Sequence, residues 1–399
     1  MPRVALLCPG LGRVHRGHES FARNLFDLLS DSLDITLFKG GGPASAREIV
    51  VPHIARDAVG LQDIKLPVSP RWHASEAGQE RIRIECTSFA WAALGALLEG
   101  GFDVIHCLDR DVCNVIYAQR HLFRHTPRVL FSNGGAIPAD DLPSCDFVQE
   151  HTELNLKHSV RGKAFMIPHG VNMAIYHPDI ETDFRARHNI PADAVLLICV
   201  GTICFWHKRM DYVIKEIAAA GQDLHLAIVG QDSEDSPAIR ELGYKLLGDR
   251  VHFDSLAPTE LPKAYAAADA FVLGSIFETF GLVYIEAMAM GLPVICTNHP
   301  NQKSIVKEGV FIDMARPGAL TEVLSVGHQA RWQALGRRSL DIARKYYDIR
   351  SLKQQYLLKY AEIATAPTKL PTWDLARRAT QNVRGTLRWA KRTIRGQSE

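Results

Sequence analysis

The segment AFVLGSIFETFGLVYIEAMAMGLPVICTN, residues 270–298, contains two short apolar runs on either side of a longer stretch with a helical pattern. The runs 270–275 and 293–298 are typical of buried parallel strands, because they are continuously apolar and end in a small or polar residue. The stretch between them predicts a helix that ends at Gly291. A strand, a helix and a strand in succession indicate a parallel β-α-β unit.

The same alternation of apolar runs and helical patterns extends along the chain. Further runs lie at 4–10, 34–40, 103–109, 128–134, 164–170, 195–201, 224–230 and 251–256. Residues 167–179 are rich in Pro, Gly and Asn without clear periodicity, which predicts a linker between two domains. We therefore predict an α/β fold with two Rossmann-like, doubly wound domains, over 1–172 and 173–365, and a C-terminal tail over 366–399.

Composition excludes several classes of protein. The chain has 399 residues, is 47% hydrophobic and carries a formal net charge of +2, but residues 371–399 alone contribute +5 and the remainder −3. A mildly acidic body does not indicate nucleic-acid binding. The eight cysteines form no C-x-x-C pair, so buried free thiols are favoured over disulfides or zinc. With no signal peptide and no run of about 18 apolar residues, we expect a cytoplasmic protein.

The basic tail has an amphipathic pattern. Apolar residues recur at spacings of three and four between 376 and 394, seven Lys/Arg lie largely outside that stripe, and Trp373 and Trp389 are typical of membrane interfaces. This pattern predicts a helix on an anionic membrane surface on the cytoplasmic side. A helix packed on the body and a solvated tail are the alternatives.

Two carboxylates stand out in the opening segment. Glu278 precedes the predicted helix and Glu286 lies eight residues later, close to two helical turns, so the two share one side at a separation of about 12 Å. The amides at the helix start attract phosphate, and Gly281 allows a ligand to approach the backbone. A diphosphate with hydroxylated groups at both ends, as in a nucleotide sugar, suits this geometry. The alternative is that these carboxylates only complement the helix terminus or face solvent.

The segment FETFGLVYIEAMAMGLPVICTN resembles the Glu-x7-Glu signature of retaining glycosyltransferases with the GT-B fold, the group 1 or family 4 class. FMIPHGVNMAIYHP, LAIVGQD and ELPKAYAAADAFVLGS resemble further segments of the family in the same order. The resemblance covers residues 3–365 and is strongest over 195–300. It implies two domains facing a central cleft, and transfer of a sugar from a nucleotide-sugar donor to a hydroxyl acceptor, a glycan or a lipid-linked glycan, with retention of configuration.

The resemblance also implies roles for single residues. Glu278 contacts the hydroxyls of the donor sugar at the reaction centre, and Glu286 holds the ribose. The backbone between them binds the diphosphate and sugar at Thr279, Phe280, Gly281 and Leu282. In VGTICFWHKRMDYVI, residues 200–214, Lys208 matches the family's lysine that neutralises the diphosphate.

The chain departs from the family at the neighbouring arginine. Thr202 stands at that position and carries no charge, so Lys208, alone or with Arg209, has to neutralise the diphosphate. Adjacent residues on a helix point in different directions, which limits what Arg209 can add.

The N-terminal half contributes further candidates. PGLGRVHRGHESFARNL resembles the family's glycine-rich loop, in which Gly12 and Gly17 let the backbone approach the donor and Arg16 replaces a glycine and adds charge. An ordinary turn between a strand and a helix is the alternative. In DVIHCLDR, His106 and Asp109 stand where the family often has a His-x-His facing the cleft. His106 is equally typical of a buried core histidine.

No metal-ligand motif such as H-E-x-x-H and no Asp-x-Asp is evident, so we expect a metal-independent reaction without a cofactor. Two other functions remain open from the sequence: a GT-B epimerase acting on a sugar nucleotide, and a non-catalytic, membrane-attached protein that binds sugar nucleotides.

Overall fold

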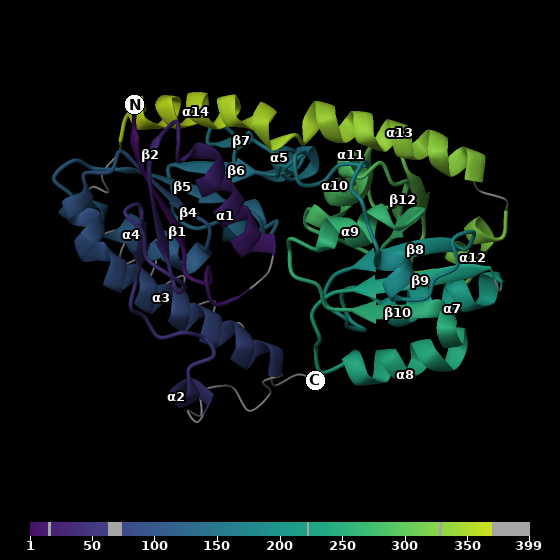
Figure 1. The fold of residues 1–399 in the computed structure, drawn as a ribbon. Helices are drawn as coiled ribbons and strands as arrows, with labels where there is room; N and C mark the ends of the chain where they lie inside the picture. The colour runs from purple at the N-terminus through teal and green to yellow at the C-terminus, as the bar shows by residue number, and fades with distance from the viewer. Residues whose placement is uncertain (15–16, 63–73, 222, 327–328, 369–399) are drawn as a thin grey trace, which may run out of the picture.

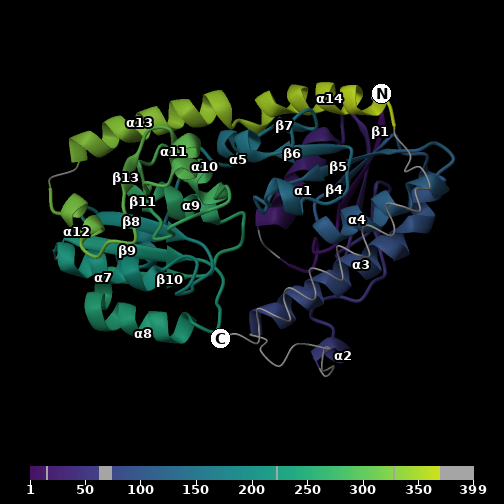
Figure 2. The ribbon, with the colours of Figure 1, turned by 180° about the vertical axis from the view of Figure 1, so that it is seen from behind.

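The computed structural model describes residues 1–14, 17–62, 74–221, 223–326 and 329–368. Two α/β domains lie side by side, each built on one parallel sheet, and two long helices run across the top of both (Figures 1 and 2). The predicted α/β class and the two Rossmann-like domains are confirmed.

The first domain is a seven-stranded sheet among the described residues, in the order β3-β2-β1-β4-β5-β6-β7, with every pair parallel. Its strands are β1 (Arg3–Cys8), β2 (Asp34–Lys39), β3 (Glu48–Val50), β4 (Val104–Cys107), β5 (Arg128–Ser132), β6 (Phe147–Glu150) and β7 (Ala164–Met166). Its helices are α1 (Gly17–Leu29), α2 (Val59–Gln62), α3 (Ala74–Gly100), α4 (Arg110–Ala118) and α5 (Glu153–His158), with 3₁₀ turns at Arg120–Leu122 and Ala139–Asp141.

The second domain has a six-stranded sheet in the order β10-β9-β8-β11-β12-β13, again parallel throughout. Its strands are β8 (Val195–Val200), β9 (Leu224–Val229), β10 (Val251–Asp254), β11 (Ala270–Val272), β12 (Val294–Thr297) and β13 (Val310–Ile312). Its helices are α6 (Phe184–Arg187), α7 (Met210–Ala220), α8 (Ser236–Leu247), α9 (Leu261–Ala266), α10 (Leu282–Ala289), α11 (Pro300–Val306), α12 (Ala319–Leu324) and α13 (Gln329–Tyr346), with a 3₁₀ turn at Gly248–Arg250.

The last helix, α14 (Ile349–Thr365), leaves the second domain and packs on the first. Leu352, Tyr356, Tyr360 and Ile363 are buried in the same apolar cluster as residues of α1 and β1. Helices α3 and α4 cover the opposite face of that sheet. The first core is therefore completed by residues from the C-terminal end of the described chain.

The chain crosses between the domains twice, and the two crossings are hydrogen-bonded to each other. Val171 of the linker donates its N–H to the carbonyl of Tyr347 at 2.8 Å, and Ile349 donates to the carbonyl of Val171 at 3.1 Å. Val171 and Asp348 thus form an isolated parallel bridge. The predicted linker and the break between α13 and α14 together make a single hinge region.

The longer strands agree with the runs predicted from the sequence, whereas three short strands, β3, β6 and β13, were not predicted. Strand β6 contains Gln149 and Glu150, which are buried although they are polar. Gln149 donates to the carbonyl of Ile167 and to the hydroxyl of Tyr356, and Glu150 accepts from Asn133 and Ser159. These hydrogen bonds permit Gln149 and Glu150 to be buried. Because both residues are polar, β6 does not stand out as an apolar run in the sequence.

Among the described residues, no helix combines the length and apolarity needed to traverse a bilayer. The predicted amphipathic segment 371–399, including Trp373 and Trp389, lies outside the described residues.

Candidate active site

The loops that follow β8 and β11 bring Lys208 and Glu278 together. The Nζ of Lys208 lies 2.6 Å from Oε1 of Glu278, and the side chains are 13% and 6% exposed. The hydroxyl of Ser275 donates to the same oxygen at 2.7 Å, and Nε2 of His207 lies 3.5 Å from it. Parallel strands present their carboxyl ends at one edge of a sheet, which is where such folds place ligands. A largely buried, ion-paired carboxylate therefore lies at the ligand-binding edge of the second sheet.

The loop that carries Glu278 is held rigidly from behind by α11. The buried side-chain amide of Asn301 donates to the carbonyls of Glu278 and Thr279 at 3.0 and 2.9 Å, and that of Gln302 donates to the carbonyl of Glu278 at 2.7 Å. These bonds satisfy loop carbonyls that would otherwise be buried without partners. They also fix the position of Glu278 relative to Lys208.

Helix α10 begins directly after this loop. Gly281 occupies its N-cap with φ of +78°, a left-handed conformation that favours glycine, and the first helical residue is Leu282. Phe280 is buried and packs edge-on against His169 of the linker, with ring centroids 4.7 Å apart. Thr279 is half-buried. The backbone from Thr279 to Leu282 thus forms the amino terminus of an eight-residue helix, as the sequence predicted.

Glu286 lies deeper along the same helix. Its carboxylate accepts a hydrogen bond from the hydroxyl of Tyr265 at 3.0 Å, and Tyr176 lies beyond that ring, with centroids 6.2 Å apart. Burial raises the pKa of Glu286 to about 7, and the hydrogen bond from Tyr265 lowers it in part. The second carboxylate of the motif is therefore poised to change its charge near neutral pH.

The predicted candidates Thr202 and Arg209 lie on the same loop as Lys208, together with Gly201, which was not predicted. Gly201 has φ of +148°, and a Cβ there would lie 2.8 Å from Cε of Lys208, so the lysine stem lies against the bare glycine backbone. Thr202 is exposed on the same loop. Arg209 caps α7 with φ of +50°, and its guanidinium donates to the carbonyls of Gly274 and Met314. In this state Arg209 braces the loop, and Lys208 presents its ammonium to the carboxylate.

The glycines predicted in the first domain lie at the carboxyl end of β1. Gly12 has φ of +86°, and a Cβ there would overlap the carbonyl of Gly41. Gly17 is the first residue of α1, and a Cβ there would lie 3.6 Å from Cδ1 of Leu282. The start of α1 therefore faces the start of α10 across the domain boundary. Arg16 lies outside the described residues.

The remaining candidates, His106 and Asp109, lie in different environments. His106 is fully buried in β4, where its Nδ1 lies 2.8 Å from the hydroxyl of Tyr360 on α14, and burial lowers its pKa to about 3. It is a core residue that ties α14 to the sheet. Asp109 lies at the strand end, and its Oδ2 is 3.2 Å from Nε2 of His18. Despite the burial of His18, Asp109 and Cys8 raise the imidazole pKa well above its usual value.

Aromatic rings fill the boundary between the domains near the hinge. His151, after β6, and His169 are stacked with centroids 3.9 Å apart, and Phe21 of α1 packs edge-on against both. Burial lowers the pKa of both histidines, to about 3 for His151, so they are neutral packing groups.

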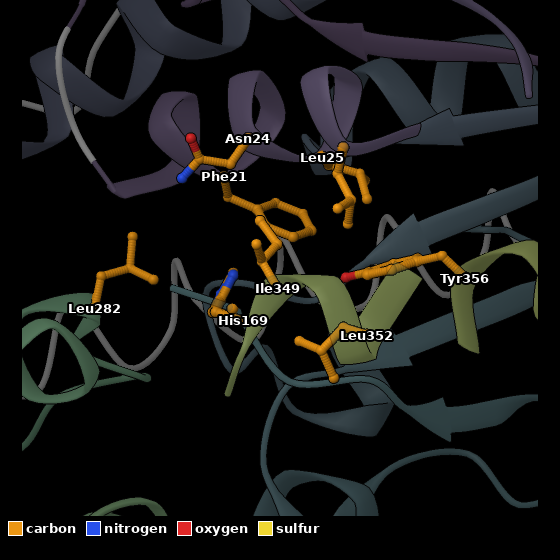
Figure 3. Close-up of a pocket in the computed structure, with 10 residues that line it drawn as sticks. Phe21, Asn24, Leu25, His169, Leu282, Ile349, Leu352 and Tyr356 are labelled. Atoms are coloured by element: carbon orange, nitrogen blue, oxygen red, sulfur yellow. The ribbon is translucent and has the colours of Figure 1, made fainter. Parts of the chain in front are cut away.

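A small cavity of about 10 Å³ lies beside these rings. Figure 3 shows side chains from α1, the linker, α10 and α14 converging on it, among them Phe21, Leu25, His169, Leu282, Leu352 and Tyr356. A volume of this size holds about one water molecule. The cavity is a packing defect of the hinge and cannot accept a nucleotide.

Sequence reasoning did not identify Ser275, Asn301, Gln302, His207 or His18. Asn301 and Gln302 act through loop carbonyls more than 20 residues away, so no local pattern reveals them. Ser275 ends the quoted apolar run, and its position next to the signature was the one available signal. His18 becomes notable only when α1 is placed beside β4.

The two parallel sheets, the shared hinge and the final helix returning to the first domain define the GT-B fold. The Thermosynechococcus elongatus sucrose-phosphate synthase structure matches with a TM-score of 0.73 and 21% identity, covering 92% of this chain and 100% of that one. Anabaena HepE in complex with UDP and glucose matches with a TM-score of 0.71 and 14% identity, covering 91% and 100%. Identities this low establish the fold alone.

The second domain resembles a known sequence family. Residues 180–328 match the family described as glycosyl transferases group 1. The chain is 27% identical over 238 residues to mannosylfructose-phosphate synthase of Agrobacterium fabrum, covering 54% of this chain and 52% of the relative. It is 30% identical over 216 residues to D-inositol 3-phosphate glycosyltransferase of Thermobispora bispora, covering 51% and 48%. The part of the chain that resembles this family is the second domain, and the chain spans about half the length of the curated relatives it matches.

Proposed function

We propose that this protein is a retaining glycosyltransferase that transfers a sugar from a nucleoside diphosphate sugar to a hydroxyl acceptor. The observation that carries the proposal is the pairing of Lys208 with Glu278 in front of the amino terminus of α10. A cation, the backbone amides at the start of a helix and two carboxylates complement a diphosphate flanked by two sugars.

The donor binds by replacing the internal ion pair. The ammonium of Lys208 moves its contact from Glu278 to the diphosphate, and the carboxylate of Glu278 then accepts hydrogen bonds from the donor sugar. Both side chains are largely withdrawn from water, and an unpaired buried charge is costly. The ligand therefore has to supply a new partner for each of them. Glu286, deeper along α10, accepts a hydrogen bond from the ribose in its ionised form.

Charge on the departing diphosphate is the main electrostatic demand of the reaction. Thr202 supplies no cation, and the guanidinium of Arg209 is engaged by the carbonyls of Gly274 and Met314. We therefore assign the stabilisation to Lys208 and to the amides at the start of α10. The bond between the anomeric carbon and the phosphate oxygen breaks as the bond to the acceptor oxygen forms. The acceptor's proton passes to the departing phosphate oxygen.

The acceptor is a hydroxyl of a glycan or of a lipid-linked glycan, and the basic segment 371–399 places the protein on the cytoplasmic face of an anionic membrane. UDP is the first nucleotide to test, because it is bound in the HepE structure of the same fold. Flotation with phosphatidylglycerol vesicles tests the membrane step. The full chain floats with the vesicles, and a chain ending at Pro367 stays in solution.

The catalytic proposal is tested by incubating the full chain with UDP-, GDP- and ADP-sugars and measuring release of the nucleoside diphosphate. Slow hydrolysis releases it without an acceptor, and Glu278→Ala and Lys208→Met abolish release. The matched control is the exposed pair Lys263 and Glu260, whose Nζ and Oε2 lie 2.7 Å apart in the same domain. Lys263→Met and Glu260→Ala leave release unchanged.

Two outcomes point to the other functions. Conversion of the sugar without nucleotide release identifies an epimerase. Thermal stabilisation by a nucleotide sugar with no turnover, in the presence of glycan and lipid-linked acceptors, identifies a non-catalytic binding protein. Normal turnover by Glu278→Ala refutes the assignment of the site.

A further inference from the structure

Three potential metal ligands from distant parts of the sequence meet at the carboxyl edge of the first sheet. Cys8 ends β1, His18 lies in the first turn of α1, and Asp109 follows β4. One ligand atom from each lies within 4.8 Å of the other two. We propose that Cys8, His18 and Asp109 bind one zinc ion.

The spacing of the ligand atoms fits tetrahedral coordination. Nε2 of His18 and Oδ2 of Asp109 are 3.2 Å apart. Two ligands that each lie about 2.0 Å from a zinc ion at the tetrahedral angle are separated by about 3.3 Å. A thiolate about 2.3 Å from the ion lies about 3.5 Å from either of them. Because the sulfur of Cys8 lies within 4.8 Å of both atoms, coordination requires a shift of at most about 1.3 Å, within reach of a side-chain rotation.

The surroundings suit a metal with one open position. Cys8 is fully buried, whereas the side chains of His18 and Asp109 are 26% and 16% exposed. The site is therefore closed to solvent on the side of Cys8 and open on the side of His18 and Asp109. Asp109 occupies the N-cap of α4, yet its carboxylate makes no capping hydrogen bond and turns to His18 instead. Three protein ligands leave the fourth tetrahedral position for water or another oxygen ligand.

The chemistry of the ligands selects zinc over magnesium and calcium. A thiolate and an imidazole are soft or intermediate ligands, whereas magnesium and calcium require oxygen. Zinc binds a thiolate and a neutral imidazole, so binding releases the protons that these groups carry.

The experiment is a titration of the full chain, without a polyhistidine tag, first with cobalt(II) as a spectroscopic substitute and then with zinc(II) in a calorimeter. One cobalt ion per chain produces tetrahedral d–d bands in the visible and a thiolate-to-cobalt charge-transfer band in the near ultraviolet. Zinc then removes both bands and binds with a stoichiometry of one, and because protons are released, its observed binding enthalpy changes with the ionisation enthalpy of the buffer.

Matched variants assign the ligands. Cys8→Ser abolishes the charge-transfer band, and His18→Ala and Asp109→Asn each weaken zinc binding by more than about tenfold. The control is Cys107→Ser, which changes another fully buried thiol at a strand end of the same sheet and leaves the spectrum unchanged. Circular dichroism identifies variants that remain folded.

The proposal is overturned if the wild-type chain produces no charge-transfer band, or if folded Cys8→Ser retains it. It is also overturned if zinc binds only weakly at several sites and the His18 and Asp109 variants bind as the wild type does. These readouts measure metal binding alone, so they are independent of whether the protein transfers sugar.

Discussion

Replacing Lys208 with methionine removes the cation but keeps most of the side-chain volume, and we expect it to destabilise the second domain. The substitution leaves Glu278 as a buried carboxylate, because only 6% of that side chain is exposed. Removing one partner of a buried ion pair costs about 3–5 kcal/mol. The Ser275 hydroxyl at 2.7 Å and His207 at 3.5 Å remain beside the charge, which places the cost near the lower end, about 3 kcal/mol.

A double-mutant cycle combines this substitution with Glu278→Gln. Lys208 keeps its charge, but its longer side chain can redirect the ammonium to water, so we expect a loss of only about 1–2 kcal/mol. The double variant contains no uncompensated charge and loses about the same amount. The coupling energy between the two residues is therefore about 3 kcal/mol.

The assay is urea-induced unfolding at pH 8, followed by circular dichroism, for the wild type, both single variants and the double variant. The same cycle on Lys263 and Glu260, whose side chains are 39% and 43% exposed, is the control, and its coupling energy stays below about 1 kcal/mol. Equal coupling energies in the two cycles would refute the view that Lys208 and Glu278 form a desolvated pair. Lys208→Met also weakens nucleotide-sugar binding by about 10- to 100-fold, the equivalent of one charged hydrogen bond.

Three further predictions test other parts of the structure. Because the pKa of Glu286 is about 7, nucleotide-sugar affinity increases roughly tenfold from pH 6 to pH 8, and Glu286→Gln abolishes this dependence in a binding titration. The folded protein also keeps a proton that the unfolded chain releases between about pH 4.5 and 7, so stability decreases as pH rises through that window, and less so in Glu286→Gln. Gly201→Ala displaces the side chain of Lys208 and weakens donor binding. The control is Gly221→Ala, at φ of +139° with nothing within 4 Å of the new Cβ, which lowers stability only. Equal donor affinities in the two variants would contradict this placement of Lys208. Ending the chain at Asp348 removes α14 and exposes the first core, so thermal denaturation shows a separate, lower transition, whereas ending it at Pro367 keeps every core residue of α14 and leaves that transition unchanged.

The fold was predictable where the sequence carries long apolar runs. Strands such as β1, β8 and β9 are six residues long and almost entirely buried, so their composition alone identifies them. The strands that escaped prediction are three or four residues long, and β6 contains a buried glutamine and glutamate. Their stability comes from pairing and hydrogen bonds that form only in the assembled sheet.

The site was predictable to the extent that it is local. Glu278, Gly281 and Glu286 belong to one loop and one helix, so their spacing defines their geometry. The contact of Lys208 with Glu278 joins residues 70 positions apart; the family resemblance assigned both residues to the donor site but did not predict that they contact each other. The cluster of Cys8, His18 and Asp109 depends on the order of strands in the sheet, because β1 and β4 become neighbours only through a crossover.

The paired crossings at Val171 and Asp348 determine how the two halves of the molecule can move. Because the two connecting segments are hydrogen-bonded to each other at one place, we expect the domains to rotate about that place rather than to slide past each other. Phe280, two residues from Glu278, packs against His169 and Tyr347 beside that bridge, so a movement of the hinge reaches the loop that carries the ion pair. Asp348 leads directly into α14, which packs on the core of the first domain. A ligand that moves the two domains closer together is therefore expected to change the packing of that core as well.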